Sequence, residues 1–258
     1  MKTKIDVYLF GDSIIENSAY VKDNHDVSNL IHSKLKTPSR LSNFDIEVCH
    51  HATDGALTAD IRDQVRRAKL HGLRRGATSI AVFTGGGNDA LGSLDYLKHR
   101  QKNFDISTPE FLDDWRYWTN VYNELLEELI YDFHYTMPCS IYNEIPTFDV
   151  IRRPPRSTLF PYTTLFRLYN DYIIQKAIKL ELTYCDIRTV MESPTDYASV
   201  SPIEPSETGG DWIAELIVQH IDILLTNKIR SSRPYQSKKN VLTFSSHHDI
   251  INSSVSNP

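Results

Sequence analysis

Residues 5–13 read IDVYLFGDS, a β-forming apolar run that ends directly in a tight glycine turn. Four further β-forming runs follow along the chain, at 44–49 (FDIEVC), 79–84 (SIAVFT), 137–142 (MPCSIY) and 182–187 (LTYCDI). Several of these runs are almost continuously apolar, which is typical of strands in a sheet that is covered on both faces. The pattern therefore predicts five buried strands.

Helical patterns separate the predicted strands. Thr108-Pro109-Glu110 has the form of an N-cap followed by proline at the first helical position. Apolar residues recur at helical spacing over residues 61–68, 112–129, 169–180 and 213–224. Strands that alternate with helices build parallel βαβ units, so we expect an α/β fold, a three-layer α/β/α sandwich with a five-stranded parallel sheet. Ligands of such sheets bind at the carboxyl ends of the strands.

The composition of the 258 residues is that of an ordinary globular protein, with 40% hydrophobic and 24% charged residues. The net charge of −5 argues against nucleic acid as a partner, because phosphate binding requires a basic face. No apolar stretch approaches the roughly 20 residues of a membrane span. The cysteines show neither zinc spacing nor a disulfide framework, so we expect a reducing, cytoplasmic setting; they are Cys49, Cys139 and Cys185.

The turn after the first strand is Gly11-Asp12-Ser13. A serine on a tight glycine turn between a strand and a helix can expose its Oγ at the sheet edge, where the helix N-terminus favours negative charge. Asp12 supports the same turn. The alternative is that Asp12 or Ser13 only caps the following helix.

Two later turns carry related features. Gly55 follows the second strand, and its backbone N–H can approach a ligand closely, although an ordinary turn glycine is the alternative. Gly85-Gly86-Gly87-Asn88-Asp89 follows the third strand, and an asparagine side chain can donate to an oxyanion. The Gly-Lys-Ser/Thr ending of a phosphate loop is absent, so the loop is either a substrate loop or a flexible connection.

These three turns, in this order, resemble the sequence blocks of the SGNH (GDSL) hydrolase superfamily. Gly11-Asp12-Ser13 is similar to the first block, Gly55 to the second and Gly87-Asn88-Asp89 to the third. The resemblance covers about residues 5–225, apart from residues 152–167. It implies a flavodoxin-like sheet and a serine esterase or lipase-like hydrolase that acts on a small acyl ester without a metal or organic cofactor.

The resemblance also implies a role for each matching residue. Ser13 would be the nucleophile, and the N–H of Ser13, the N–H of Gly55 and the side chain of Asn88 would form the oxyanion hole. The last block of the family reads Asp-x-x-His, but here Ser201 and Glu204 occupy those two positions, within Ile-Glu-Pro-Ser. A free glutamate is less basic than histidine by about 2 pKa units, on the order of 3 kcal/mol, unless burial raises its pKa.

Three hypotheses follow for the missing histidine. Glu204 is the base in a dyad with Ser13, and Ser201 donates a hydrogen bond to it; this is the hypothesis that we adopt. Alternatively, a different histidine serves, with His51 better placed than His50 because it lies in the turn that carries Gly55. In the third hypothesis the chain is a catalytically silent binding protein with the SGNH fold.

One segment does not fit the pattern. Residues 152–167 (RRPPRSTLFPYTTLFR) contain three prolines and four arginines without a helical or strand period. The string resembles the translation of a sequencing-adaptor contaminant of metagenomic assemblies; a genuine basic lid is the alternative. We expect that a neutral linker can replace it without loss of folding. The sequence thus predicts one domain over 1–227 and a poorly ordered tail over 228–258, and it does not indicate the oligomeric state.

Overall fold

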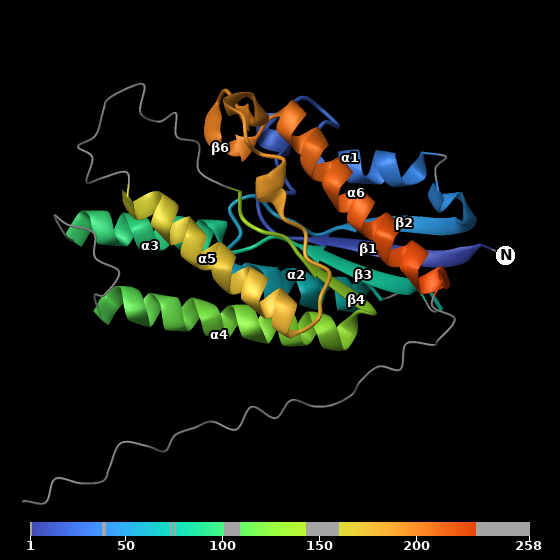
Figure 1. Cartoon of the computed structure of the whole chain (residues 1–258), viewed down its shortest axis with the longest axis horizontal. Coiled ribbons are helices and arrows are strands. Elements are labelled where there is room, and N and C mark those ends of the chain that lie inside the picture. Colours follow the sequence, from blue (N-terminus) through green and yellow to red (C-terminus); the bar gives the residue numbers. More distant parts are fainter. Residues whose placement is uncertain are drawn as a thin grey trace, which may run out of the picture.

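The protein was analysed as a computed structural model that describes residues 2–37, 40–72, 74, 76–100, 109–142 and 160–230. Its centre is a parallel sheet of β1 (Thr3–Phe10), β2 (Phe44–His50), β3 (Thr78–Phe83) and β4 (Tyr135–Pro138), in the order β2-β1-β3-β4. β1 lies in the middle and pairs with both β2 and β3, so that Val7 stands opposite Val48 and Ile80. The turn after β1 therefore leaves the sheet between the ends of two neighbouring strands (Figure 1).

Helices cover both faces of this sheet, which confirms the three-layer α/β/α architecture (Figure 1). One layer holds α1 (Val27–Lys36) and α6 (Glu207–Arg230), which pack on each other. The other layer holds α2 (Thr58–His71), α3 (Gly87–Arg100), α4 (Pro109–Asp132) and α5 (Phe160–Lys179). α4 begins at Pro109, as the proline at the first helical position predicts.

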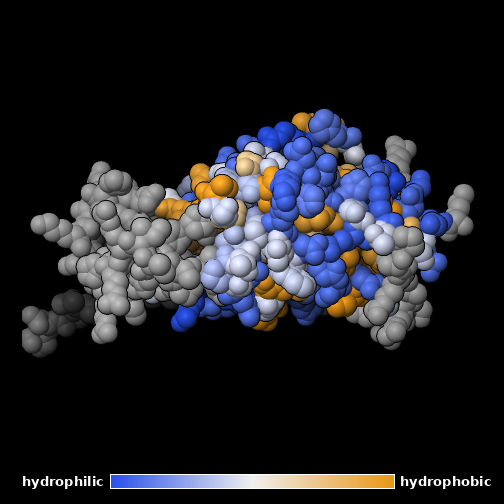
Figure 2. Space-filling view, turned by 90° about the horizontal axis from the view of Figure 1, so that it is seen from above, coloured by the Kyte–Doolittle hydropathy of each residue, from blue (hydrophilic) through white to orange (hydrophobic). Residues whose placement is uncertain are grey.

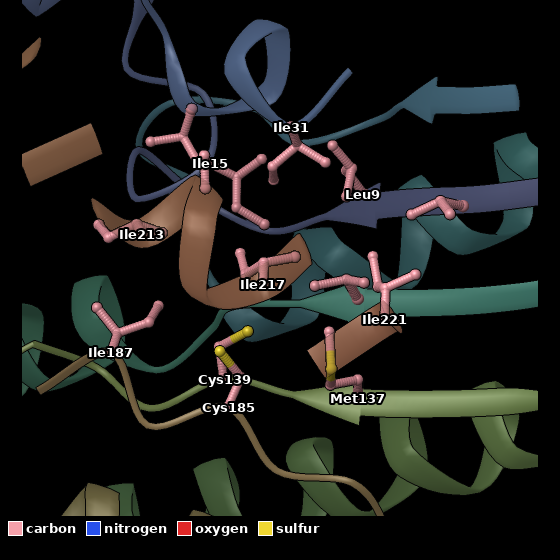
Figure 3. Packing of buried hydrophobic residues seen from close by; sticks show 14 of the residues in the cluster. Leu9, Ile15, Ile31, Met137, Cys139, Cys185, Ile187, Ile213, Ile217 and Ile221 are labelled. Carbon is pink, nitrogen blue, oxygen red and sulfur yellow. The ribbon is translucent and has the colours of Figure 1, made fainter. Parts of the chain in front are cut away.

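Alternate side chains of β1 enter two separate cores, because successive residues of a strand point to opposite faces. Val7 and Leu9 pack with Ile31 and Ile217 beneath α1 and α6, as the close-up in Figure 3 shows for Leu9. Tyr8 and Phe10 pack with a largely aromatic core under α2, α4 and α5, whose buried members include Trp118, Tyr122 and Tyr169. Seen from above, the outer surface of the α1 and α6 layer is mainly hydrophilic (Figure 2).

The fifth predicted strand is reduced to a single parallel bridge between Cys139 and Cys185. Two backbone hydrogen bonds make it, from the Cys185 N–H to the Pro138 carbonyl (3.0 Å) and from the Ser140 N–H to the Cys185 carbonyl (2.9 Å). The pairing stops there because Asp186 caps the short 3-10 helix η4 (Ile187–Thr189). The described sheet therefore has four strands where the sequence predicted five.

β4 also ends earlier than predicted. The chain beyond Pro138 turns to a side chain instead of a neighbouring strand, since the Ile141 N–H donates to Asn170 Oδ1 (2.8 Å) and the Ile141 carbonyl accepts from Asn170 Nδ2 (3.0 Å). Asn170 lies on α5 and is buried. It satisfies both polar groups of Ile141 where the sheet no longer can.

A small antiparallel hairpin lies outside the main sheet. It consists of β5 (Tyr197–Ala198) and β6 (Ser201–Pro205), preceded by the 3-10 helix η5 (Pro194–Asp196) and followed by α6. Two further 3-10 helices, η1 (Ser18–Tyr20) and η2 (Arg40–Asn43), flank α1. Ser201 and Glu204, the two residues that differ from the last sequence block of the SGNH hydrolases, lie on β6 of this hairpin.

The expectation that residues 152–167 lack helical structure is wrong for residues 160–167, which form the first turns of α5. Leu165 and Phe166 are buried in the aromatic core beside Tyr169, so they continue the apolar side of that helix. A linker replacing the whole segment would remove both side chains from the core. Residues 152–159 lie outside the described residues.

The C-terminal boundary is only partly visible. Residues 228–230 belong to α6, although the sequence placed them in the tail, and the predicted tail beyond residue 230 lies outside the described residues. In the part of the chain that the structure describes, no helix combines the length and apolar character that crossing a membrane requires.

Candidate active site

The first predicted turn follows β1 directly. Gly11 has φ +141°, and a Cβ built on it would stand 2.1 Å from the Thr84 Oγ1, so glycine alone fits against the end of β3. The N–H groups of Ile15 and Glu16 donate to the Asp12 carbonyl (3.1 and 3.0 Å) and close a single turn after Ser13. The sequence predicted a helix at this point, but the first α-helix begins only at Val27.

Asp12 braces this turn from within. Its carboxyl oxygen Oδ1 accepts from the Thr84 hydroxyl (2.8 Å) and from the Ile14 N–H (3.2 Å), and its own N–H donates to Thr84 Oγ1 (3.3 Å). The side chain is buried, and burial raises the pKa of Asp12 to about 6 although the two hydrogen bonds lower it. Asp12 thus caps the turn, and Ser13 is held on it.

Glu204 lies beside Ser13. The carboxyl group belongs to β6, is only 5% exposed and lies close enough to the Ser13 side chain to interact with it. Burial raises the pKa of Glu204 to about 7; the interaction with the Ser13 side chain opposes this shift, and the nearby charges of Asp12 and Asp54 add to it. The Glu204 Oε2 atom is buried without a hydrogen-bond partner among the described residues.

Asn17 explains why the hairpin reaches the first turn. Its side chain is fully buried and donates from Nδ2 to the Pro205 carbonyl (3.0 Å), while Oδ1 accepts from the Val27 N–H (2.9 Å). Gly209 allows α6 to start close by, since a Cβ there would lie 1.9 Å from the Asp196 carbonyl oxygen. Asn17 and Pro205 are 188 positions apart in the sequence, so only folding brings the hairpin to the first turn.

The two remaining turns present hydrogen-bond donors. Gly55 has φ +76°, a conformation that favours glycine, in an exposed turn. The N–H groups of Ser13 and Gly55 donate to no described residue. Asn88 lies at the start of α3 and donates from Nδ2 to the Ala56 carbonyl (3.0 Å). An amide nitrogen carries two hydrogens, so one donor of Asn88 is still available to a ligand.

A buried network fixes the second turn to the third. Asp89 Oδ2 accepts from the Thr58 N–H (3.0 Å) and the Thr58 hydroxyl (2.8 Å), and the Trp118 Nε1 donates to the same hydroxyl oxygen (3.0 Å). Burial raises the pKa of Asp89. Thr58 begins α2 just after Gly55, and Asp89 follows Asn88. The network therefore fixes the position of Gly55 relative to Asn88, the two residues that are predicted to contribute to the oxyanion hole.

Two of the candidate residues lie elsewhere. The His51 ring stacks on Phe10 (ring centroids 5.4 Å apart) and on Tyr8 (6.1 Å). Burial lowers the pKa of His51, and the charges of His71 and Arg67 near the far end of α2 lower it further. The His50 ring lies 5.9 Å from that of His32 instead. Neither histidine contacts Ser13 among the described residues.

Ser201 opens β6 three residues before Glu204 and pairs with Ala198 of β5, and the pairing of these two strands is irregular between Ala198 and Tyr197. Among the described residues, no hydrogen bond joins Ser201 to Glu204. The role of Ser201 as a hydrogen-bond donor to Glu204 therefore stays a prediction.

The structure adds residues that the sequence analysis did not single out. Tyr20 donates to Asp54 Oδ2 (3.0 Å) at the exposed side, and the charge of Glu204 contributes to the raised pKa of buried Tyr142. Gln64 contacts Gly11 from α2. The one signal for Gln64 was a polar residue within the apolar stripe at 61–68. Among the described residues, no three His, Cys, Asp or Glu side chains converge as metal ligands would.

Comparison with known proteins bears on the fold. No family model and no curated protein matches the sequence. Solved structures do match: a lipase from a goat rumen metagenome (17% identity, TM-score 0.61, covering 84% of this chain and 97% of that one) and an acetyl xylan esterase from Geobacillus stearothermophilus (13%, 0.60, 86% and 96%). A lipolytic protein of the G-D-S-L family from Veillonella parvula is similar too (12%, 0.59, 83% and 97%). The chain therefore has the fold of the SGNH (GDSL) hydrolases.

Proposed function

We propose that this protein is a serine esterase that hydrolyses a small acyl ester, with Ser13 as nucleophile and Glu204 as general base. The observation that carries the proposal is the Glu204 carboxyl, buried beside the Ser13 side chain, with its pKa raised to about 7. A free glutamate would be too weak a base by about 2 pKa units, but at about 7 the group matches histidine near 6.5. Burial thus offsets the loss of the histidine.

In the proposed reaction, the Ser13 Oγ attacks the ester carbonyl while its proton passes to Glu204. The carbonyl oxygen, now negative, is held by the N–H groups of Ser13 and Gly55 and by the second Nδ2 hydrogen of Asn88. Collapse of this intermediate expels the alcohol, which takes the proton from Glu204. A water molecule, deprotonated by Glu204, then attacks the carbonyl of the acyl-serine. The bond between the acyl carbon and Ser13 Oγ breaks, Ser13 takes the proton back from Glu204, and the acid is released.

A glutamate base also accounts for the serine at position 201. A histidine base becomes a cation when it takes the proton, and a neighbouring aspartate stabilises that cation. A glutamate becomes neutral at the same step, so it requires no anionic partner. The two departures from the family's last block therefore belong to one change of mechanism.

The substrate class is proposed from the neighbours and the site. Two structures with this fold are named as a lipase and an acetyl xylan esterase, which supports an ester of a short acyl group such as acetyl. Ser13 is only 5% exposed, which favours a small acyl group over a bulky one.

The first test is labelling with a fluorophosphonate probe. We expect the parent protein to be labelled, Ser13→Ala to lose all labelling, and Glu204→Gln to be labelled at least about 10²-fold more slowly. Glu207→Gln is the matched control, because it removes a partly exposed carboxylate whose ion pair among the described residues is with the exposed Lys22. Labelling at the parent rate in Glu204→Gln would refute Glu204 as the base, and a folded parent that is not labelled would favour the silent binding protein.

A further inference from the structure

Gln64 makes two hydrogen bonds to one residue of the nucleophile turn. The Gly11 N–H donates to Gln64 Oε1 (2.8 Å), and Gln64 Nε2 donates to the Gly11 carbonyl (2.8 Å). Gln64 is 1% exposed and lies on α2 among side chains that are otherwise apolar. A buried amide in such a place is costly unless it is fully hydrogen-bonded, so the pair of bonds sets its orientation.

Gly11 is also where the first two turns meet. The ladder of β1 ends at Phe10, whose carbonyl accepts from the Thr84 N–H (3.2 Å). The Gly11 carbonyl accepts a second bond from the Thr53 N–H (3.0 Å), in the turn that carries Gly55. Gln64 therefore holds the residue that links the serine turn to the second oxyanion turn, while Thr84 blocks movement on the other side.

We propose that Gln64 is a positioning residue for the oxyanion hole: its amide fixes the Gly11 peptide groups and thereby the directions of the Ser13 and Gly55 N–H groups. The catalytic consequence rests on the proposed function. A group at this position must donate and accept in one plane at the same time. Glutamine does so at every pH, and a protonated carboxyl does so only while it keeps its proton.

This difference between an amide and a carboxyl can be tested with the variant Gln64→Glu. In Gln64→Glu, the protonated side chain can reproduce both bonds, but the ionised one loses its donor and places a negative charge against the Gly11 carbonyl. The ionisable groups of the neighbouring turns are four acids, Asp12, Asp54, Asp89 and Glu204, and one base, His51, whose pKa is lowered by burial. The acids oppose ionisation at this site, as burial does. Gln64→Leu removes both bonds at every pH. The matched control is Gln219→Glu, which makes the same charge change on an exposed part of α6.

Two measurements decide the proposal. In hydrolysis of 4-nitrophenyl acetate, we expect Gln64→Leu to lower kcat about 10²-fold with KM within about twofold, because the misplaced donors act in the transition state. Gln64→Glu should match the parent at acidic pH and lose activity on the alkaline side, where the parent and Gln219→Glu remain active. Parent-like profiles in both Gln64 variants would overturn the proposal.

Amide hydrogen exchange tests the same idea without activity. In Gln64→Leu, exchange at the Gly11 N–H should accelerate at least about tenfold relative to that of Val7 in the middle of β1, which reports global opening. Equal acceleration at both amides would overturn the positioning role. If the parent neither labels nor hydrolyses, the proposed esterase function fails, but the ratio of exchange rates still decides whether Gln64 holds the turn.

Discussion

The two ends of β1 each bury an aspartate, and the fold surrounds them differently. Asp6, toward the amino end, is 1% exposed and forms an ion pair with Arg74, which also reaches Glu47 and Asp45. Asp12, just past the carboxyl end, is 2% exposed and has Thr84 and the Ile14 N–H as partners, with no ion pair among the described residues.

Glu204 extends the contrast at the carboxyl end. It is buried near Asp12 and the Ser13 side chain without an ion pair among the described residues, and burial raises its pKa. Removing the arginine from a buried ion pair leaves an uncompensated charge inside the fold, whereas a carboxyl that is buried among other acids is poised to exchange a proton near neutral pH. Raised carboxyl pKa values cluster at functional sites for this reason.

The largest expected effect comes from removing the proton acceptor at the carboxyl end. Glu204→Gln should lower kcat/KM by roughly 10²–10⁴-fold, since general base catalysis is lost. At pH 8 the same variant should unfold at a temperature no lower than the parent, because it removes a buried charge that has no cation. Steady-state kinetics and thermal unfolding on one preparation check both statements. A large loss of stability with unchanged kinetics would contradict this prediction, because Glu204 would then have a structural role and no catalytic one.

The amino end should respond in the opposite way. Arg74→Met leaves Asp6 buried without its cation, and we expect a loss of about 2 kcal/mol in the free energy of unfolding, with the activity of the folded protein unchanged. Urea denaturation measures the first and kinetics the second. Arg66→Met is the matched control, because that arginine pairs with Asp63 on an exposed helix face, where ion pairs contribute little. A loss of activity in folded Arg74→Met would show that the ends are not independent.

The third expected effect is a pH dependence in which activity and stability change in opposite directions. The pKa of Glu204 is raised from 4.5 to about 7 and that of Asp12 from 3.8 to about 6, so between these values the folded state holds more protons than the unfolded state. Their contribution to stability is therefore complete below about pH 4 and is lost as the pH rises to about 7. Activity should rise through about pH 7 as Glu204 loses its proton.

Denaturation at several pH values, compared between the parent and Glu204→Gln, isolates this contribution. The variant should lose less stability than the parent over that interval. An equal loss in both proteins would mean that Glu204 does not take up its proton in the folded state.

Local signals were sufficient for much of the fold. The strand at 3–10 with its glycine turn, the strand that leads into the Gly-Gly-Gly loop, and the start of α4 at Pro109 all follow from residues that are neighbours in sequence. One error lies where a distant group took over, and the other where a neighbouring helix cap did. Asn170 draws Ile141 away from β4, and Asp186 ends the pairing of Cys185 after one residue.

The same division holds for the candidate site. The sequence identified Ser13, Gly55, Asn88 and Glu204 through their motifs, and it could not tell how His51 or Ser201 would be oriented. The first of these stacks on Phe10, and the second pairs with Ala198 at the irregular end of the hairpin. Gln64, Asn17 and Thr84 were missed because a single buried polar residue in an apolar stripe or strand carries no motif.

By itself, the sequence determined which chemical groups this protein has and on which turns they lie, because strand, turn and helix preferences act over a few residues. Only the tertiary structure decided that the Glu204 carboxyl is buried beside Ser13 and has a raised pKa. The pKa of a carboxyl depends on burial and on neighbouring charges, and here those come from β6, from the turn after β1 and from Asp54, segments that only folding brings together.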